Sequence, residues 1–237
     1  MSFIITVYTN EGIIMASDSR TTYVTTKIGN GGMLEKHVGS QLTDSTNKTF
    51  LCEESNIGLS TCGESSIDGM PIAGYIEDFI SHETNADSTV QSISQGLLDY
   101  FGKYTPIPTT SFIVSGYSKV DFKQYISRVF VASQEIIPID TTVPGVLWDG
   151  ETDIFKRLVK PVSLKREDGS YEELPVYSTG YNFFTLQDAI DFAEYAVDVT
   201  IKTMFFQQRV KSVGGPIDIL AIKPSGAFWV KRKELHA

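Results

Sequence analysis

The chain has 237 residues, of which 41% are hydrophobic and 21% are charged. A chain of this length can bury a large core without cross-links, so its two cysteines do not indicate a disulfide framework. The 29 acidic residues outnumber the 20 basic ones, and the formal net charge of −9 argues against nucleic acid as the main partner. No apolar run approaches the ~18 residues of a membrane span, and the N-terminus lacks the basic start of a signal peptide. We therefore expect a soluble cytoplasmic protein with residues 1–237 in a single domain.

The predicted strands and helices occur in separate blocks along the chain. Short β-branched or aromatic runs between turn residues predict strands at 2–8, 13–17, 49–52, 57–63, 111–115, 124–132, 136–139, 217–222 and 227–231. Apolar positions three and four residues apart predict helices at 67–80, 90–101, 152–159 and 186–205. The expected caps of the first, second and fourth helices are Ser65 or Ser66, Ser88 and Thr185. Such blocks predict an α+β domain with helices packed outside its sheets.

Two segments are predicted to be less regular. Residues 21–45 are rich in Thr, Gly and Ser and are interpreted as a strand pair with a long loop. Residues 160–180 are interpreted as a polar loop. By contrast, the first two strands are apolar on both faces, which is typical of a sheet that is covered on each side.

The common motifs of phosphate-binding, dinucleotide-binding, zinc-peptidase and serine-hydrolase sites are missing from the sequence. A Ser-His-Asp triad would need His37, His82 or His236, and each of these is expected at the surface. Three histidines and two cysteines also provide too few ligands for a Cys/His zinc site. If the chain is a hydrolase, we expect its base to be a group other than histidine.

One constellation of residues remains, at the N-terminus. If Met1 is removed, Ser2 carries a hydroxyl and a free α-amine on the same residue, and an amine with a pKa near ~8 can act as a general base. Such a base needs a nearby cation to lower its pKa further, and a carboxylate to hold that cation. Lys48 and Asp18 are the candidates, because each lies at a strand boundary. From the residues alone, the alternative is that Asp18 caps a turn and that Lys48 is a solvated strand start.

The segment from Gly12 to Thr22 resembles the G-[VI]-[VI]-x-A-x-D-x-R-x-T signature of proteasome β-type subunits. A bacterial ring protease that is paired with an unfoldase ATPase carries a related signature. In the register of that family, Ser2 takes the place of the nucleophilic N-terminal threonine, and Lys48 resembles the catalytic lysine. The strand that ends at Gly63 resembles the one that leads to the oxyanion-hole glycine. Residues 212–219 are similar to the family's Gly-Gly strand entry.

The resemblance implies a four-layer αββα sandwich, the fold of N-terminal-nucleophile hydrolases. It implies that Ser2 attacks an amide carbonyl, that Lys48 lowers the pKa of the α-amine, that Asp18 orients Lys48, and that the Gly63 N–H stabilises the oxyanion. The substrate would be a peptide or another amide, and no cofactor or metal is implied. A homo-oligomer, with a ring as one form, and an ATPase partner are further implications of the family.

The sequence departs from the family pattern at several positions. The nucleophile would be a serine, and the long interval between Asp18 and Lys48 makes residues 23–46 an insert. The family's auxiliary Asp and Ser fall on Val210 and Val213, with Ser212 as a substitute, and the serine expected after Gly145 is Val146. Two alternatives therefore stay open: a non-catalytic scaffold subunit, and an amidase for small acyl compounds on the same fold.

Two other groups of residues are expected to have structural roles. Lys231–Lys233 is interpreted as a solvated charge run. An aromatic cluster is interpreted as helix packing or a subunit interface, and comprises Tyr181, Phe183, Phe184, Phe205 and Phe206.

Overall fold

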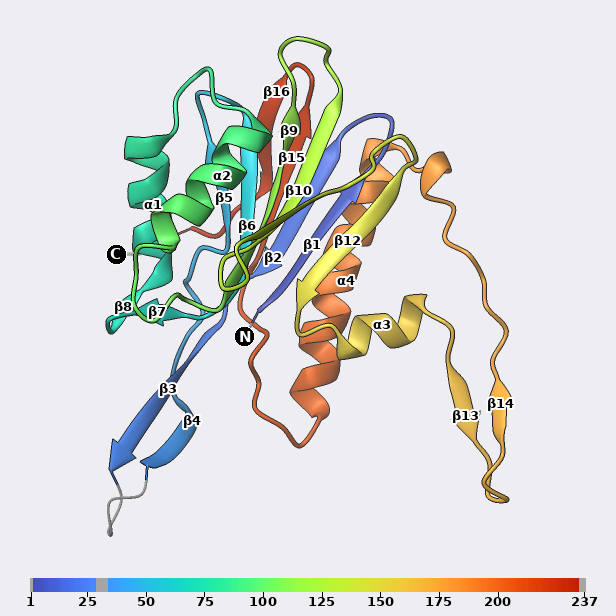
Figure 1. Cartoon of the computed structure of the whole chain (residues 1–237). Coiled ribbons are helices and arrows are strands. Elements are labelled where there is room, and N and C mark those ends of the chain that lie inside the picture. Colours follow the sequence, from blue (N-terminus) through green and yellow to red (C-terminus); the bar gives the residue numbers. More distant parts are fainter. Residues whose placement is uncertain (1, 29–33, 235–237) are drawn as a thin grey trace.

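The computed structural model describes residues 2–28 and 34–234, and shows two five-stranded sheets stacked between two layers of helices (Figure 1). The first sheet has the order β12–β1–β2–β15–β16, built from β12 (Gly145–Gly150), β1 (Phe3–Tyr8), β2 (Ile13–Asp18), β15 (Ile217–Lys223) and β16 (Gly226–Lys231). The second has the order β11–β10–β9–β6–β5, built from β11 (Glu135–Pro138), β10 (Gln124–Phe130), β9 (Thr110–Tyr117), β6 (Ile57–Gly63) and β5 (Thr49–Cys52). Both sheets are antiparallel throughout.

The helices lie on the outer faces of the two sheets. α3 (Asp153–Val159) and α4 (Leu186–Phe206) cover the first sheet, and α1 (Ile72–Glu83) and α2 (Val90–Phe101) cover the second (Figure 1). The predicted αββα sandwich is thus confirmed.

Strand alternation divides the buried side chains into three cores. In β1, Phe3, Ile5 and Val7 pack against α4, whereas Ile4 and Tyr8 face the second sheet. A third core lies between the second sheet and its helices. Because successive side chains of a strand point to opposite faces, a sheet in the middle of four layers needs apolar residues at every position. This explains why β1 and β2 lack alternation in the sequence.

The first helix starts later than predicted. Ile67 and Met70 belong to a short hairpin of β7 (Ser66–Ile67) and β8 (Met70–Pro71), and α1 begins only after Pro71. Asp68 and Gly69 turn this hairpin with φ of 50° and 79°, values that a helix does not contain. The predicted cap at Ser65 or Ser66 is therefore wrong.

The other three predicted helices begin within one residue of the predicted position. α2 is capped by Thr89 in a reciprocal capping box with Ser92, one residue after the predicted Ser88. Thr185 caps α4 as predicted, again in a capping box, with Asp188. α3 begins at Asp153, within the predicted range of 152–159.

Three further segments contain paired strands, of which only the pair within residues 21–45 was predicted. β12 was not predicted, and it pairs with β1 along its whole length. Within the supposed loop at 160–180, β13 (Ser163–Lys165) pairs with β14 (Tyr171–Glu173), which corrects that prediction. β3 (Thr21–Ile28) pairs with β4 (Leu34–Thr43), as expected for the strand pair at 21–45, while residues 29–33 of the supposed insert lie outside the described residues.

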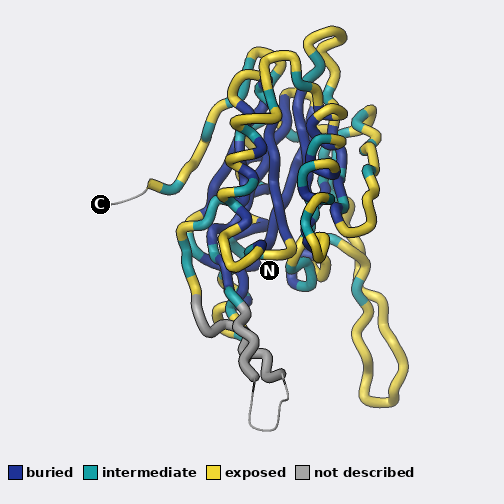
Figure 2. Tube along the Cα trace, turned by 60° about the vertical axis from the view of Figure 1, so that its left-hand side comes forward, coloured by how far each residue is buried: buried dark blue, intermediate teal, exposed yellow. Residues whose placement is uncertain are grey.

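The buried and exposed parts of the chain are sharply divided. The central strands of the two sheets are largely buried, whereas the β13–β14 hairpin projects from the body and is exposed throughout (Figure 2). None of the helices among the described residues is long and apolar enough to cross a membrane.

Candidate active site

Ser2 lies immediately before β1, at the end of the first sheet where β12 also ends. The residue is 7% exposed, and its carbonyl accepts a hydrogen bond of 2.7 Å from the N–H of Glu151. Gly150, the last residue of β12, has a φ of +90°, and a Cβ there would lie 1.9 Å from the Ser2 carbonyl oxygen. A glycine is therefore required for β12 to end this close to Ser2.

Asp18, the last residue of β2, organises the polar groups around the start of β1. Its fully buried carboxylate accepts hydrogen bonds from the Phe3 N–H (3.0 Å) and from Lys48 Nζ (2.8 Å) through Oδ1. Through Oδ2 it accepts from the N–H groups of Arg20 (3.2 Å) and Gly214 (3.0 Å). Asp18 thus joins the residue after Ser2, the lysine of the second sheet and the Gly-Gly segment before β15.

Lys48 immediately precedes β5 of the second sheet, and its side chain extends to the Asp18 carboxylate. Its side chain is 3% exposed, and its ammonium also donates to the carbonyl of Arg20. Burial lowers the pKa of Lys48 below its ordinary value, and the charge of Asp18 opposes that shift. The sequence-based pairing of Asp18 with Lys48 is therefore present as a buried ion pair, and neither residue is solvated.

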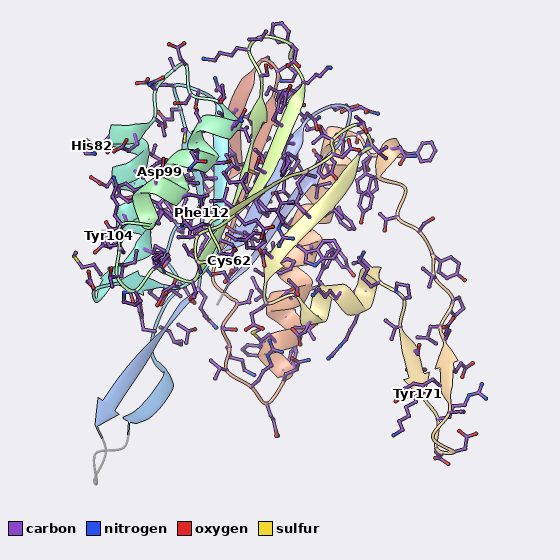
Figure 3. The ribbon with its side chains drawn as sticks, in the orientation of Figure 1. Cys62, His82, Asp99, Tyr104, Phe112 and Tyr171 are labelled. Carbon is purple, nitrogen blue, oxygen red and sulfur yellow. The ribbon has the colours of Figure 1, made fainter. Side chains whose placement is uncertain are left out.

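Gly63 ends β6 beside the start of β9. Its φ is +115°, and a Cβ there would lie 2.3 Å from the Thr109 carbonyl oxygen, so the position requires glycine. Gly63 and Ser2 line the same cavity of about 520 Å³. Cys62, which also lines it, lies between the two layers of helices in Figure 3.

Cys62 supplies a thiol to the lining of this cavity, whereas the other nucleophilic side chains that line it are serine and threonine hydroxyls. Burial raises the pKa of its thiol to about 12, and its Sγ lies 3.2 Å from Ser111 Oγ. A thiol with this pKa is protonated at neutral pH and is a poor nucleophile. The raised pKa therefore argues against Cys62 as the nucleophile of this cavity.

Acidic residues that the sequence analysis missed complete the cavity wall. Glu151 accepts from Arg209 (2.9 Å) and from Ser212 Oγ (3.4 Å), and Arg209 also binds Asp153 (2.8 Å). Asp149 accepts from Arg128 (2.7 Å) and from Ser111 Oγ (3.2 Å). The sequence signal for them is their position around Gly150, which is visible only once β12 is recognised.

Val146, which stands where the family resemblance places an auxiliary serine, lies far from the candidate site. β12 runs antiparallel to β1, so Gly145 pairs with Tyr8 and Gly150 pairs with Phe3. Val146 is therefore at the end of β12 remote from Ser2. Of the positions that replace the family's other auxiliary residues, Val213 is buried in the core below α4 and Val210 is partly exposed.

The remaining singled-out residues lie elsewhere. His82 is on the outer side of α1, where its side chain is 71% exposed (Figure 3), whereas the side chain of His37 and all of His236 and Met1 fall outside the described residues. The residues of the aromatic cluster are in two different environments. Tyr181 and Phe184 pack edge-to-face on Phe192 of α4, while Phe183, Phe205 and Phe206 are exposed.

Among the residues that the structure describes, no group of three His, Cys, Asp or Glu side chains is placed to hold a metal ion.

Two facing antiparallel sheets between helix layers, with the start of β1 at one end of the sheets, define a proteasome-like fold. A solved structure of Anbu from Hyphomicrobium sp. strain MC1 is similar, with a TM-score of 0.61 and 15% sequence identity over 98% of this chain and 88% of that chain. A mutant of the same Anbu matches with a TM-score of 0.60 and 15% identity over 94% of this chain and 82% of that chain. No family model and no curated protein matches the sequence. At this identity the likeness establishes the fold.

Proposed function

We propose that this protein is a proteasome-like N-terminal-nucleophile hydrolase that cleaves peptides or related amides with Ser2 after removal of Met1. The observation that supports this most directly is the Asp18 carboxylate, which binds both the Phe3 N–H, one residue from Ser2, and the buried Lys48 ammonium. An ion pair in this position is expensive to bury and adds little net stability, so a role in chemistry is the better explanation.

In the proposed mechanism, Ser2 Oγ attacks the amide carbonyl and its proton passes, through water, to the Ser2 α-amine. Lys48 lowers the pKa of that amine by charge proximity, and Asp18 holds Lys48 in place. The N–H of Gly63 donates to the oxyanion, a contribution typically worth ~3 kcal/mol of transition-state stabilisation. The amine then protonates the leaving nitrogen, and water hydrolyses the Ser2 ester to release the acid. All of these groups come from the chain, so the scheme uses no cofactor.

A non-catalytic scaffold subunit is the main alternative. It is favoured by Val210 and Val213, which supply no polar side chain where the resemblance leads one to expect them. The intact mass of the natively expressed protein is the first measurement that distinguishes the hydrolase from the scaffold. A mass that lacks one methionine would show that Met1 is removed and that the Ser2 amine is free. A mass that includes Met1 would mean that the amine is blocked, which rules out the mechanism and favours the scaffold.

The decisive variant is Ser2→Ala. We expect it to lower the hydrolysis of fluorogenic peptide amides by about 10³-fold or more. Thermal stability should be unchanged, because the Ser2 side chain makes no hydrogen bond within the described part of the chain. Ser2→Thr is the matched control, since it keeps the hydroxyl and the amine. Full activity of Ser2→Ala would rule out the mechanism. If small acyl amides are cleaved and peptides are not, the amidase alternative is correct.

We further propose a homo-oligomer. Large apolar side chains are exposed on and around the β13–β14 hairpin, among them Leu164, Tyr171, Val176 and Tyr177. An exposed apolar patch of this kind marks an interaction surface. If the subunits close into a ring, an ATPase partner would be needed for folded substrates, whereas short peptides could enter without one.

A further inference from the structure

The chain after β16 returns to the sheet and buries a second lysine. The N–H of Lys233 donates to Asp218 Oδ1 (2.8 Å), and the Lys233 ammonium donates to Asp218 Oδ2. The side chains of Lys233 and Asp218 are only 5% and 2% exposed. The prediction that Lys231–Lys233 is a solvated run is thus wrong for Lys233, although Lys231 does pair with Glu194 at the surface.

This second ion pair lies next to the Asp18–Lys48 pair. Asp218 of β15 is directly opposite Ser17 of β2, the neighbour of Asp18. Ser17 faces the second sheet, where its Oγ accepts a hydrogen bond of 2.9 Å from Thr49, the residue after Lys48. Ser17, the neighbour of Asp18, is therefore next to Asp218 within the first sheet, and Thr49, the neighbour of Lys48, reaches Ser17 from the second sheet.

The two pairs place two cations and two carboxylates in the interior of the fold, where each side chain is at most 5% exposed. Charges interact strongly in such a medium, because little solvent screens them. At neutral pH the charged groups that act on the Lys48 ammonium are Asp18 of β2 and Lys233 of the segment after β16. Cys62 of β6 would act on it only as a thiolate, and its raised pKa keeps it a neutral thiol. Burial is the main cause of the lowered pKa of Lys48, and the positive charge of Lys233 lowers it further.

We propose that Lys233 and Asp218 are positioning residues that set the electrostatic potential at Lys48 and at the Ser2 amine. An ion pair that served only for stability could be replaced by packed apolar side chains at no loss. A pair that shifts the pKa of neighbouring groups cannot be replaced in this way, because the sign of each charge sets the direction of the shift. The expected change in the pH dependence of kcat/KM rests on the proposed function, whereas the expected change in the titration of Lys48 does not.

The sign of each charge provides the test. Lys233→Met leaves a carboxylate without its cation, so we expect the acidic limb of the kcat/KM profile to move up by about 0.5–1 pH unit. Asp218→Asn leaves a cation without its carboxylate, so we expect the limb to move down by a similar amount. The double variant should lie between the two, and Lys233→Arg should resemble the wild type. Lys231→Met, on the same segment but at the surface, is the matched control and should not move the limb.

A second readout does not depend on activity. In the Ser2→Ala background, the Lys48 side chain is titrated by NMR with 13Cε-labelled lysine, and its signal is assigned by its loss in Lys48→Arg. Opposite shifts of the Lys48 titration in Lys233→Met and Asp218→Asn support the proposal, even if the wild type hydrolyses no amide and the proposed function fails. Shifts in the same direction, or none beyond that of Lys231→Met, overturn it. If one of the two single variants does not fold, the other still tests the proposal, because the Lys48 titration must move up in Lys233→Met or down in Asp218→Asn relative to Lys231→Met.

Discussion

The Asp18 side chain accepts four hydrogen bonds within the described part of the chain. Its two oxygens accept them from three backbone N–H groups and one ammonium. Three of these donors belong to segments far apart in the sequence. A carboxylate with this many donors is held in one orientation, so that the lysine it binds is positioned as well. Asp18 therefore fixes the start of β1 and the position of Lys48 at the same time.

The variant Lys48→Met tests both the structural and the chemical role of the Asp18–Lys48 ion pair. Loss of the lysine leaves the Asp18 carboxylate buried without a cation, which we expect to lower the free energy of unfolding by about 3–5 kcal/mol. Loss of the charge beside the Ser2 amine should also lower kcat/KM at neutral pH by about 10²-fold or more and change the pH–rate profile. Urea unfolding and peptide-amide kinetics measure the two effects.

The control for Lys48→Met is the double variant Asp18→Asn/Lys48→Met. It removes both charges, so much of the lost stability should return, whereas activity should not. Recovery of activity together with stability would show that Lys48 acts only through the fold. An unchanged pH–rate profile in Lys48→Met would remove Lys48 from the proposed mechanism.

At the scale of elements, the site depends on how β12 ends. β12 is the edge strand of the first sheet, and its last residue, Gly150, passes against the Ser2 carbonyl. The next residue, Glu151, binds that carbonyl through its N–H and carries its carboxylate to Arg209. One strand end therefore holds the backbone of Ser2 and supplies a charged wall to the cavity.

Gly150→Ala tests this arrangement. The new Cβ would meet the Ser2 carbonyl oxygen at 1.9 Å, so β1 and β12 have to separate at this end. We expect a loss of more than about 2 kcal/mol in the free energy of unfolding, beyond the cost of the positive φ itself, and a fall in activity.

Gly169→Ala is the matched control for Gly150→Ala. Gly169 has a similar φ of +84°, but nothing lies within 4 Å of its Cβ position. Only the conformational cost of about 1–2 kcal/mol applies there. Equal losses at the two positions, measured by thermal or urea unfolding, would show that contact with Ser2 is unimportant.

At the scale of the whole molecule, two features stand out. The core between the sheets joins both halves of the sandwich, so we propose that residues 1–237 unfold as one unit. The β13–β14 hairpin contributes nothing to this core and projects from the body, with Tyr171 at its exposed surface (Figure 3). A hairpin this short is unstable by itself in water, which favours its contact with another copy of the chain.

Light scattering after size-exclusion chromatography tests the homo-oligomer. Leu164→Glu combined with Tyr177→Glu places charges on the exposed apolar side chains, and we expect the assembly to dissociate to smaller species. The control is Arg166→Gln with Glu172→Gln, which removes an ion pair from the same hairpin and should leave the mass unchanged. A monomeric wild type, or an unchanged mass in the glutamate variant, would contradict the proposal.

The sequence by itself was sufficient to predict the layered α+β fold and the N-cap of the longest helix, because both follow from local apolar runs and turn residues. Ser2, Asp18 and Lys48 were candidates from their residue types and places on the predicted strands, whereas Gly63 entered only through the family resemblance. The first helix was predicted too long, because Ile67 and Met70 happen to continue the helical spacing of α1 across the Asp68–Gly69 turn.

Only the tertiary structure decided how deeply the predicted Asp18–Lys48 pair is buried and which other polar groups meet. Glu151, for example, reaches Arg209 from an edge strand that the sequence did not reveal. Lys233 follows two other basic residues and looks solvated in the sequence, yet it is buried against Asp218. Burial and ion pairing at these positions depend on strand register and on the return of the chain after β16, which bring together residues far apart in the sequence. Local spacing contains no information about such contacts.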